Sequence, residues 1–191
     1  AGRTGARVLA LDGARSLGAK ILVAGGGRCN VTHDYVDASS YFGSSPNAIR
    51  KVLRRFDVSD TVEFFENYGV TLKREDTGKL FPTTDRARTV LDALLRAADE
   101  AGVIIKFPRR VETIRRHDDS FHVSGEWGEV SAPRLILATG GRALPKSGSD
   151  GLGYEFARTL GHSVCDQIHP ALVPLILPGD HPFREISGIA I

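Results

Sequence analysis

The feature that most constrains the fold of this chain is a run of three glycines, Gly25-Gly26-Gly27, followed by Arg28-Cys29-Asn30. Three adjacent glycines lose much backbone entropy on folding, so a plain turn does not favour them. A backbone without Cβ atoms can approach a flat ligand closely, and its N–H groups can point at phosphate or at ring oxygens. The run therefore predicts a ligand-contacting loop. The alternative is a tight glycine-rich turn that carries a solvated arginine.

The predicted cofactor-binding segment extends from Lys20 to Thr32, with an apolar strand over 20–24 leading into the glycines. Arg28 offers a fixed fork of donors, and Asn30 and Thr32 add an amide and a hydroxyl. Cys29 has two interpretations. It is either a reactive thiol that faces the substrate or a small residue that fits a tight bend.

Composition sets the class of protein and excludes several functions. Of 191 residues, 41% are hydrophobic and 25% charged, which is typical of a globular domain. The net charge of +2 gives no reason to expect nucleic acid or a membrane surface as partner. Two cysteines, Cys29 and Cys165, cannot form a disulfide framework, so we expect a reducing, cytoplasmic setting. The histidines form no metal-ligand pattern, and we expect no metal.

The apolar patterning predicts an α/β fold with parallel-type strands near both ends of the segment. The expected elements are a strand over 7–12, helices over 48–56, 59–68 (capped by Ser59), 85–101 and 153–161, a hairpin over 70–81 turning at Thr77-Gly78, an antiparallel meander within 103–130, and a buried strand over 135–138.

Two further groups of residues have the pattern of a nucleotide site. Asp12 ends the first strand, where doubly wound folds bind a ribose hydroxyl; the alternative is a turn-favouring aspartate. A second glycine-rich stretch follows the strand over 135–138 and opens a helix, whose first amides can bind an anion. Its candidate residues are Thr139, Gly140, Gly141, Gly148, Ser149, Gly151 and Gly153. By itself, a capped helix start explains this stretch at least as well.

Catalytic residues are not defined by the sequence. Cys29 and His169 are weak candidates, the histidine as a proton donor before Pro170. A structural or exposed histidine is the alternative.

Several phrases follow one another along the chain: KILVAGGGRCNVT at 20–32, GVTLK at 69–73, GKLFP at 78–82, ILATGG at 136–141, GSDGLGY at 148–154 and PALVPL at 170–175. In this order they resemble a bacterial flavoprotein family, the BaiN-like NAD(P)/FAD-dependent oxidoreductases, some labelled aminoacetone oxidase family.

The resemblance implies a doubly wound FAD-binding domain of the two-dinucleotide-binding type, with an antiparallel meander and an inserted, mostly β domain. Residues 1–171 would form the incomplete FAD-binding domain, without its first strand and GxGxxG turn, and 172–191 would begin the inserted domain. The chain would thus be a central piece of a longer protein. Asp12 would stand where the family places an acid on the ribose, and Val111 would meet adenine through its backbone.

The implied function is FAD-mediated hydride transfer from NAD(P)H to a small organic acceptor of unknown identity. The alternative is a nucleotide-binding module without turnover, or an inactive fragment of a flavoprotein. We expect a small-molecule substrate as partner, without nucleic acid or membrane; the oligomeric state is open.

Overall fold

The computed structural model describes residues 1–41, 45–143, 148–165, 168 and 178–182. The chain divides into two compact units. The first comprises Ala1–Leu9 and Gly18–Ile104, and the second comprises Ala10–Leu17 and Ile105–Ile191.

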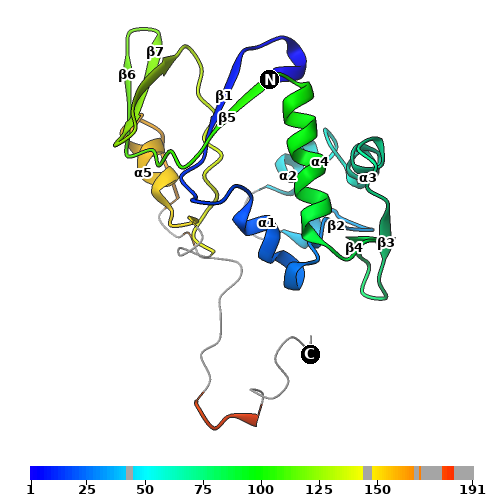
Figure 1. Ribbon diagram of the computed structural model, residues 1–191. Coiled ribbons are helices and arrows are strands. Elements are labelled where there is room, and N and C mark those ends of the chain that lie inside the picture. The colour runs from blue at the N-terminus through cyan, green and yellow to red at the C-terminus, as the bar shows by residue number, and fades with distance from the viewer. Residues whose placement is uncertain (42–44, 144–147, 166–167, 169–177, 183–191) are drawn as a thin grey trace. The chain divides into compact units, whose positions relative to one another are not determined.

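The first unit contains an antiparallel sheet of order β2-β4-β3, with α3 against β2 and β3, and α4 against β4 (Figure 1). Its elements are η1 (Gly2–Thr4), α1 (Ala19–Val23), η2 (Ala24–Gly27), β2 (Thr32–His33), η3 (Ala38–Ser40), α2 (Pro46–Leu53), α3 (Val58–Asn67), β3 (Leu72–Arg74), β4 (Lys79–Pro82) and α4 (Ala87–Glu100), where η marks a 3-10 helix. The hairpin and the three longer helices confirm the sequence prediction.

The core of the first unit gathers where α1, α3 and α4 meet the sheet. Its buried members are Cys29, Phe65, Val70, Ala87, Val90 and Ala93. Gly18 allows the close approach of α1 to α4, because a Cβ at this position would lie 2.5 Å from Leu91 Cδ1.

Helix α3 begins one residue earlier than predicted, and Asp57, not Ser59, caps it. The Asp57 carboxylate accepts the Asp60 N–H at 3.0 Å, and the Asp60 carboxylate accepts the Asp57 N–H at 2.8 Å. Ser59 donates its hydroxyl to Asp57 instead. A reciprocal capping box satisfies two N–H groups, which explains why it prevails over a single serine cap.

The second unit contains an antiparallel meander of order β6-β7-β8 and the helix α5, which contacts β6 (Figure 1). The bounds are β6 (Thr113–His117), β7 (Ser120–Gly125), β8 (Gly128–Ala132) and α5 (Leu152–Thr159). Ile114, Val123 and Phe156 form its buried core, and Trp127 and Leu135 pack against them.

Strands β1 (Val8–Leu11) and β5 (Val103–Lys106) pair with each other. Beyond the strand end, Asp12 donates its N–H to the Lys106 carbonyl at 3.1 Å, and its carbonyl accepts the Arg109 N–H at 2.7 Å. The N–H and the carbonyl of Asp12 thus bond to two different residues, an earlier one and a later one, which fits strands that run in the same direction. The prediction that residues 103–107 join the antiparallel meander is therefore wrong, since β5 is a partner of β1.

Two predicted strands are absent from the described residues. Residues 19–23 form the helix α1, because Ile21 and Leu22 lie on one side and pack against the first core. Residues 135–138 are not in a strand, and Ile136 is 76% exposed. An apolar run forms a strand only where a neighbour completes its backbone hydrogen bonds, and no such neighbour is present among the described residues.

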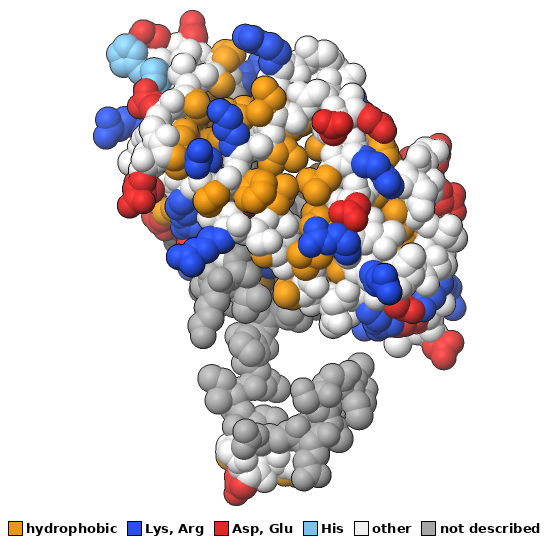
Figure 2. Space-filling model, in the orientation of Figure 1, with side chains coloured by type: hydrophobic (Ala, Val, Ile, Leu, Met, Phe, Trp, Pro, Cys, Tyr) orange, Lys and Arg blue, Asp and Glu red, His pale blue; other side chains and the backbone are white. Residues whose placement is uncertain are grey.

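Hydrophobic and charged side chains are mixed on the face shown in Figure 2, where hydrophobic groups lie between basic and acidic ones. Among the described residues, the most exposed large hydrophobic side chains include Ile136, Val52, Tyr35, Val23 and Ile104. None of the described helices has the length and apolar character that crossing a membrane requires.

Candidate cofactor site

The glycine-rich loop is a left-handed turn that follows α1. Gly25, Gly26 and Gly27 have φ values of 56°, 68° and 87°. Residues other than glycine rarely adopt this backbone conformation, because their Cβ crowds the backbone. Cys29, with φ 63°, also lies in this region, and its N–H closes the loop on the Ala24 carbonyl at 2.9 Å.

Gly25 and Gly26 differ in what surrounds them. A Cβ on Gly25 would lie 2.9 Å from both Phe81 Cε1 and the Asn30 nitrogen, so this position is filled by the protein itself. A Cβ on Gly26 would meet no heavy atom within 4 Å. Gly26 is exposed, and its backbone is open on the side where a side chain would project. This open backbone fits close contact with a flat ring.

Arg28 contacts protein groups, whereas the sequence predicts ligand contacts for it. Its Nη1 lies 2.5 Å from Glu75 Oε1 and 3.8 Å from Asp85 Oδ1. Its guanidinium carbon lies 4.1 Å from the centroid of the buried Phe81 ring. Sequence reasoning missed all three partners. A signal for the Phe81 contact was the phrase 78–82, because its hairpin brings Phe81 back to the glycine loop.

Cys29 lies in the first core and is 7% exposed. Burial raises the pKa of its thiol, because the charged thiolate is poorly solvated there. The thiol is therefore kept in its neutral, less nucleophilic form. Of the two interpretations, these observations favour the small residue in a tight bend.

The remaining candidates of this segment flank the loop. Val31 donates its N–H to the Leu80 carbonyl at 2.9 Å, and Thr32 is opposite Leu80 in the sheet. The loop is thus joined to β4 at its end. Asn30 and Lys20 are exposed, with Lys20 on α1.

Asp12 lies directly after β1, at the strand end that the sequence predicts. One carboxylate oxygen accepts the Ala14 N–H at 2.8 Å. Gly13 lies against Arg110, since a Cβ on Gly13 would be 3.0 Å from Arg110 Cδ. Val111, the predicted adenine neighbour, is partly buried and packs against the second core.

The second glycine-rich stretch brings four predicted residues together. A Cβ on Gly153 would lie 1.9 Å from Thr139 Oγ1, and one on Gly140 would lie 3.2 Å from Ser149 Oγ. Ser149 is 4% exposed. Thr139 therefore passes the first turn of α5 at a distance that requires glycine at 153, and Gly140 lies close to the buried Ser149 before that helix.

The other three glycines of this stretch lie around the same turn. Gly148 and Gly151 have φ values of 93° and 86°, and Gly151 is the N-cap residue of α5. A Cβ on Gly141 would lie 3.1 Å from the Tyr154 hydroxyl.

A carboxylate already occupies the N-terminus of α5. Asp150 Oδ1 accepts the Leu152 N–H at 3.1 Å, and Asp150 also pairs with Arg110. The Leu152 N–H, and next the Arg110 guanidinium, lower the pKa of Asp150. Of the two interpretations of this stretch, an anion site at the first amides of α5 and a capped helix start, these contacts favour the capped helix start. An aspartate two residues before a helix is a signal for such a cap.

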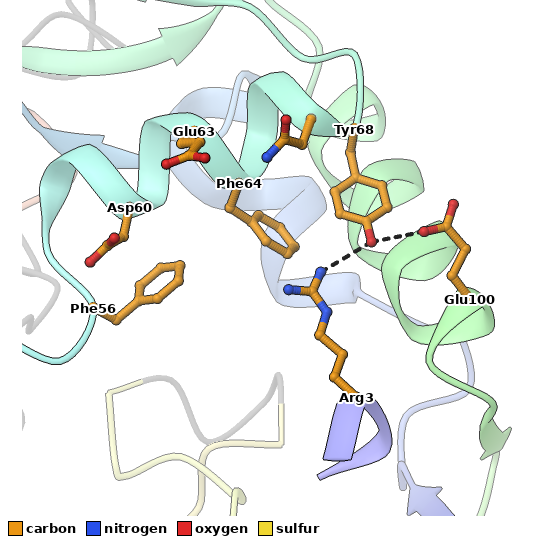
Figure 3. A pocket seen from close by; sticks show the side chains of 8 residues that line it. Arg3, Phe56, Asp60, Glu63, Phe64, Tyr68 and Glu100 are labelled. Carbon is orange, nitrogen blue, oxygen red and sulfur yellow. Dashed lines mark hydrogen bonds between the residues drawn. The ribbon is translucent and has the colours of Figure 1, made fainter. Parts of the chain in front are cut away.

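A separate groove of about 450 Å³ lies in the first unit (Figure 3). Arg3 donates to the Tyr68 hydroxyl at 3.1 Å, and that hydroxyl donates to Glu100 at 2.9 Å. Phe56 and Phe64 line its wall. Glu100 is the last residue of α4, so the groove lies at the C-terminal end of this helix. Phe81, which contacts the glycine loop, precedes its N-terminal end.

The predicted site residues fall in both units. Lys20 and the loop up to Thr32 belong to the first, whereas Asp12, Val111 and the described residues of 139–153 belong to the second. His169 and residues 172–177 and 183–191, where the inserted domain was predicted to begin, lie outside the described residues.

Comparison with known proteins identifies relatives over almost the whole chain. Residues 1–169 match the model of the HI0933-like protein Rossmann domain. A 3-dehydro-bile acid delta(4,6)-reductase of Clostridium scindens is 38% identical over 184 residues, covering 96% of this chain and 44% of the relative. A ribosomal RNA dihydrouridine synthase of Escherichia coli is 30% identical over 193 residues, covering 100% of this chain and 48% of the relative.

The chain therefore spans a little under half the length of these curated relatives. The family match includes the glycine loop, Asp12 and the start of α5, and it confirms the resemblance drawn from the sequence phrases. By this match, the chain belongs to the HI0933-like family, with a Rossmann-like domain of mixed α and β structure.

Proposed function

We propose that this chain is part of an FAD-dependent oxidoreductase. The observation that carries the proposal is the left-handed backbone of Gly26 and Gly27. A Cβ would meet no heavy atom within 4 Å at Gly26, and only the Leu22 carbonyl oxygen at 3.8 Å at Gly27. Membership of the HI0933-like family and a relative named as a reductase support the proposal.

The proposed roles of the residues follow from their chemistry. The backbone of Gly26 and Gly27 would lie against the flavin, with Asn30 as an amide partner. Asp12, with one carboxylate oxygen on the Ala14 N–H, would accept a ribose hydroxyl with the other. Thr139 and the glycines that follow it would add backbone contacts. When bound, FAD would supply the hydride-transfer chemistry, with NAD(P)H as donor and a small organic molecule as acceptor.

We also propose the domain division drawn from the resemblance. Residues 1–171 would belong to the cofactor-binding domain, and residues 172–191 would begin the inserted domain. Limited proteolysis of the gene product, followed by mass spectrometry, tests the boundary. A fragment ending near residue 171 that keeps the flavin bands would support the division.

Colour tests the cofactor directly. The gene product that contains this chain should be purified, and its visible absorbance should be recorded before and after reconstitution with FAD. We expect flavin bands that bleach on addition of NADH or NADPH under anaerobic conditions. A protein that stays colourless after reconstitution would sink the proposal. Bands that never bleach would favour the alternative, a nucleotide-binding module without turnover.

A second candidate function is reduction of a nucleoside in RNA, and the surface of α2 favours it. Four exposed basic residues, Arg50, Lys51, Arg54 and Arg55, occur within residues 38–56, a stretch without any acidic residue. Tyr41 and Phe56, near them in the sequence, are 49% and 56% exposed. Positive charge combined with exposed rings suits a nucleic acid. Two relatives are named as ribosomal RNA dihydrouridine synthases.

RNA binding separates the two candidates. The double variant Arg54→Gln/Arg55→Gln should bind a ribosomal RNA fragment more weakly than the unaltered protein, with a smaller dependence on salt, because fewer phosphates are neutralised. Arg88→Gln, on the exposed face of α4, serves as the control. Equal binding by all three proteins would exclude Arg54 and Arg55 as the binding surface, and no binding by any of them would exclude the second candidate.

A further inference from the structure

We propose that Arg28 does not bind the cofactor but positions the flavin-contacting loop from behind, through Phe81, and that Glu75 holds it there. This inference rests on the proposed flavin function. It assigns a new role to Arg28, which the sequence predicts as a cofactor ligand, and a role to Glu75, which the sequence does not indicate.

The first step is the occupation of the guanidinium. Glu75 Oε1 lies 2.5 Å from Arg28 Nη1, and Asp85 Oδ1 lies 3.8 Å away. Asp85 is itself paired with Lys73 at 2.5 Å. A phosphate that approached Arg28 would have to compete with the Glu75 carboxylate and would meet like charge from it.

The second step is the contact with Phe81. The guanidinium carbon lies 4.1 Å from the ring centroid, within the range of a cation–π contact. Phe81 is 3% exposed, so the guanidinium covers a ring that is otherwise enclosed by protein. Arginine is suited to this place, since its planar group can stack on the ring and bind a carboxylate at the same time.

The third step connects the ring to the loop. Phe81 Cε1 occupies the space where Gly25 would carry a Cβ, at 2.9 Å. The ring thus lies against the backbone of Gly25, directly before the open glycine, Gly26. The Val31–Leu80 hydrogen bond fixes the end of the loop to the same strand. Arg28, Phe81 and β4 together hold the left-handed turn in one conformation.

The hairpin supplies the anchor for Glu75. Glu75 lies in the β3–β4 turn, where its N–H donates to the Lys79 carbonyl at 2.9 Å and its carbonyl accepts the Gly78 N–H at 2.8 Å. A carboxylate on a closed turn is a fixed partner. The loop that faces the flavin is therefore stabilised by a hairpin that has no cofactor contact in the proposal.

Neutralising Glu75 distinguishes positioning from direct binding. If Arg28 bound FAD, Glu75→Gln would release the arginine and leave FAD affinity equal or higher. If Arg28 positions the loop, Glu75→Gln should weaken FAD binding about tenfold, as expected for loss of a charged contact in a partly buried pair. Arg28→Gln should do the same, and the double variant should be no worse than either single one.

Arg28→Lys adds a test of the stacking. A lysine keeps the charge but cannot stack a planar group on Phe81 while it binds Glu75. We expect Arg28→Lys to resemble Arg28→Gln in FAD affinity and in a shift of the flavin absorbance bands. Arg88→Gln, which removes an exposed pair with Asp92 on α4, is the matched control and should change neither.

Amide hydrogen exchange of the FAD-free protein provides the readout independent of the cofactor. Glu75→Gln should speed exchange at residues 25–27 while residues 113–132 stay unchanged. An unaltered protein that fails to bind FAD would refute the proposed function and the flavin role together. An unaltered protein that binds FAD while Glu75→Gln binds it equally or more tightly would refute the positioning role alone.

Discussion

At the scale of single residues, two adjacent glycines with similar backbone angles have different roles. Gly25 contacts the Phe81 ring, whereas Gly26 faces open space. Gly25→Ala should therefore lower the free energy of unfolding by about 2 kcal/mol, since a left-handed alanine is strained and its Cβ meets the ring. Gly26→Ala should cost about 1 kcal/mol, the left-handed strain alone. Urea unfolding measures both.

FAD titration of the Gly26→Ala variant tests the proposed cofactor contact. Gly26→Ala should weaken FAD binding about tenfold, because its methyl group would enter the proposed contact with the flavin ring. Equal affinity of the Gly26→Ala variant and the unaltered protein would contradict the assignment of this glycine to the cofactor.

The two cysteines should differ in reactivity. The buried Cys29 thiol has a raised pKa, whereas Cys165 is exposed. At neutral pH, iodoacetamide should alkylate Cys165 first and reach Cys29 only after denaturation, because the thiolate is the reacting form. Peptide mass spectrometry follows both sites. Rapid alkylation of Cys29 in the folded protein would restore its candidacy as a catalytic thiol.

At the scale of elements, helices with clear periodicity were predictable and the strands around them were less so. The apolar stripe of α4 and the turn at Gly78 follow from local chemistry, and both occur as predicted. The segment 19–23 is apolar enough for either a strand or a helix, and contact with α4 decides for the helix. The pairing of β5 with β1 could not be predicted locally either, because the two strands are far apart in the sequence.

The N-terminus of α5 gives a prediction for pH. The pKa of Asp150 is lowered in the folded protein, so its contribution to stability is complete above the ordinary carboxyl range. This contribution is lost as the pH falls through the lowered folded value. Asp150→Asn keeps a capping oxygen but loses the charge, so its deficit in the free energy of unfolding should shrink on acidification.

Urea unfolding between neutral and acidic pH measures that deficit. Asp119→Asn, an exposed aspartate in the β6–β7 turn, is the control and should show no such trend. A deficit that stays constant with pH would show that the charge of Asp150 does not contribute.

At the scale of the whole chain, the two cores of the described residues have no member in common. Phe65 belongs to the first core and Phe156 to the second. Phe65→Ala should destabilise the first core by about 3 kcal/mol through the cavity that it leaves. Hydrogen exchange should then rise in residues 58–67 and 87–100 while β6–β7–β8 keeps its protection. Phe156→Ala should give the reverse pattern. Uniform loss of protection in either variant would show that the two cores unfold together.

The local structure of the candidate residues was predictable, whereas their contacts were not. The turn at the glycine run, the place of Asp12 directly after β1 and a helix start after the second glycine-rich stretch follow from local sequence, and their role in binding stays a prediction. The partners of Arg28 and the pairing of Asp150 with Arg110 could not be predicted, because these residues meet across 47, 53 and 40 positions of sequence.

The contact between Gly25 and Phe81 has a consequence for how this sequence can change over time. The two positions share one small volume, and the Asn30 nitrogen borders it as well, so Phe81→Leu would relieve only part of the crowding that an alanine at 25 meets. Related chains that keep the phenylalanine should therefore keep the glycine too.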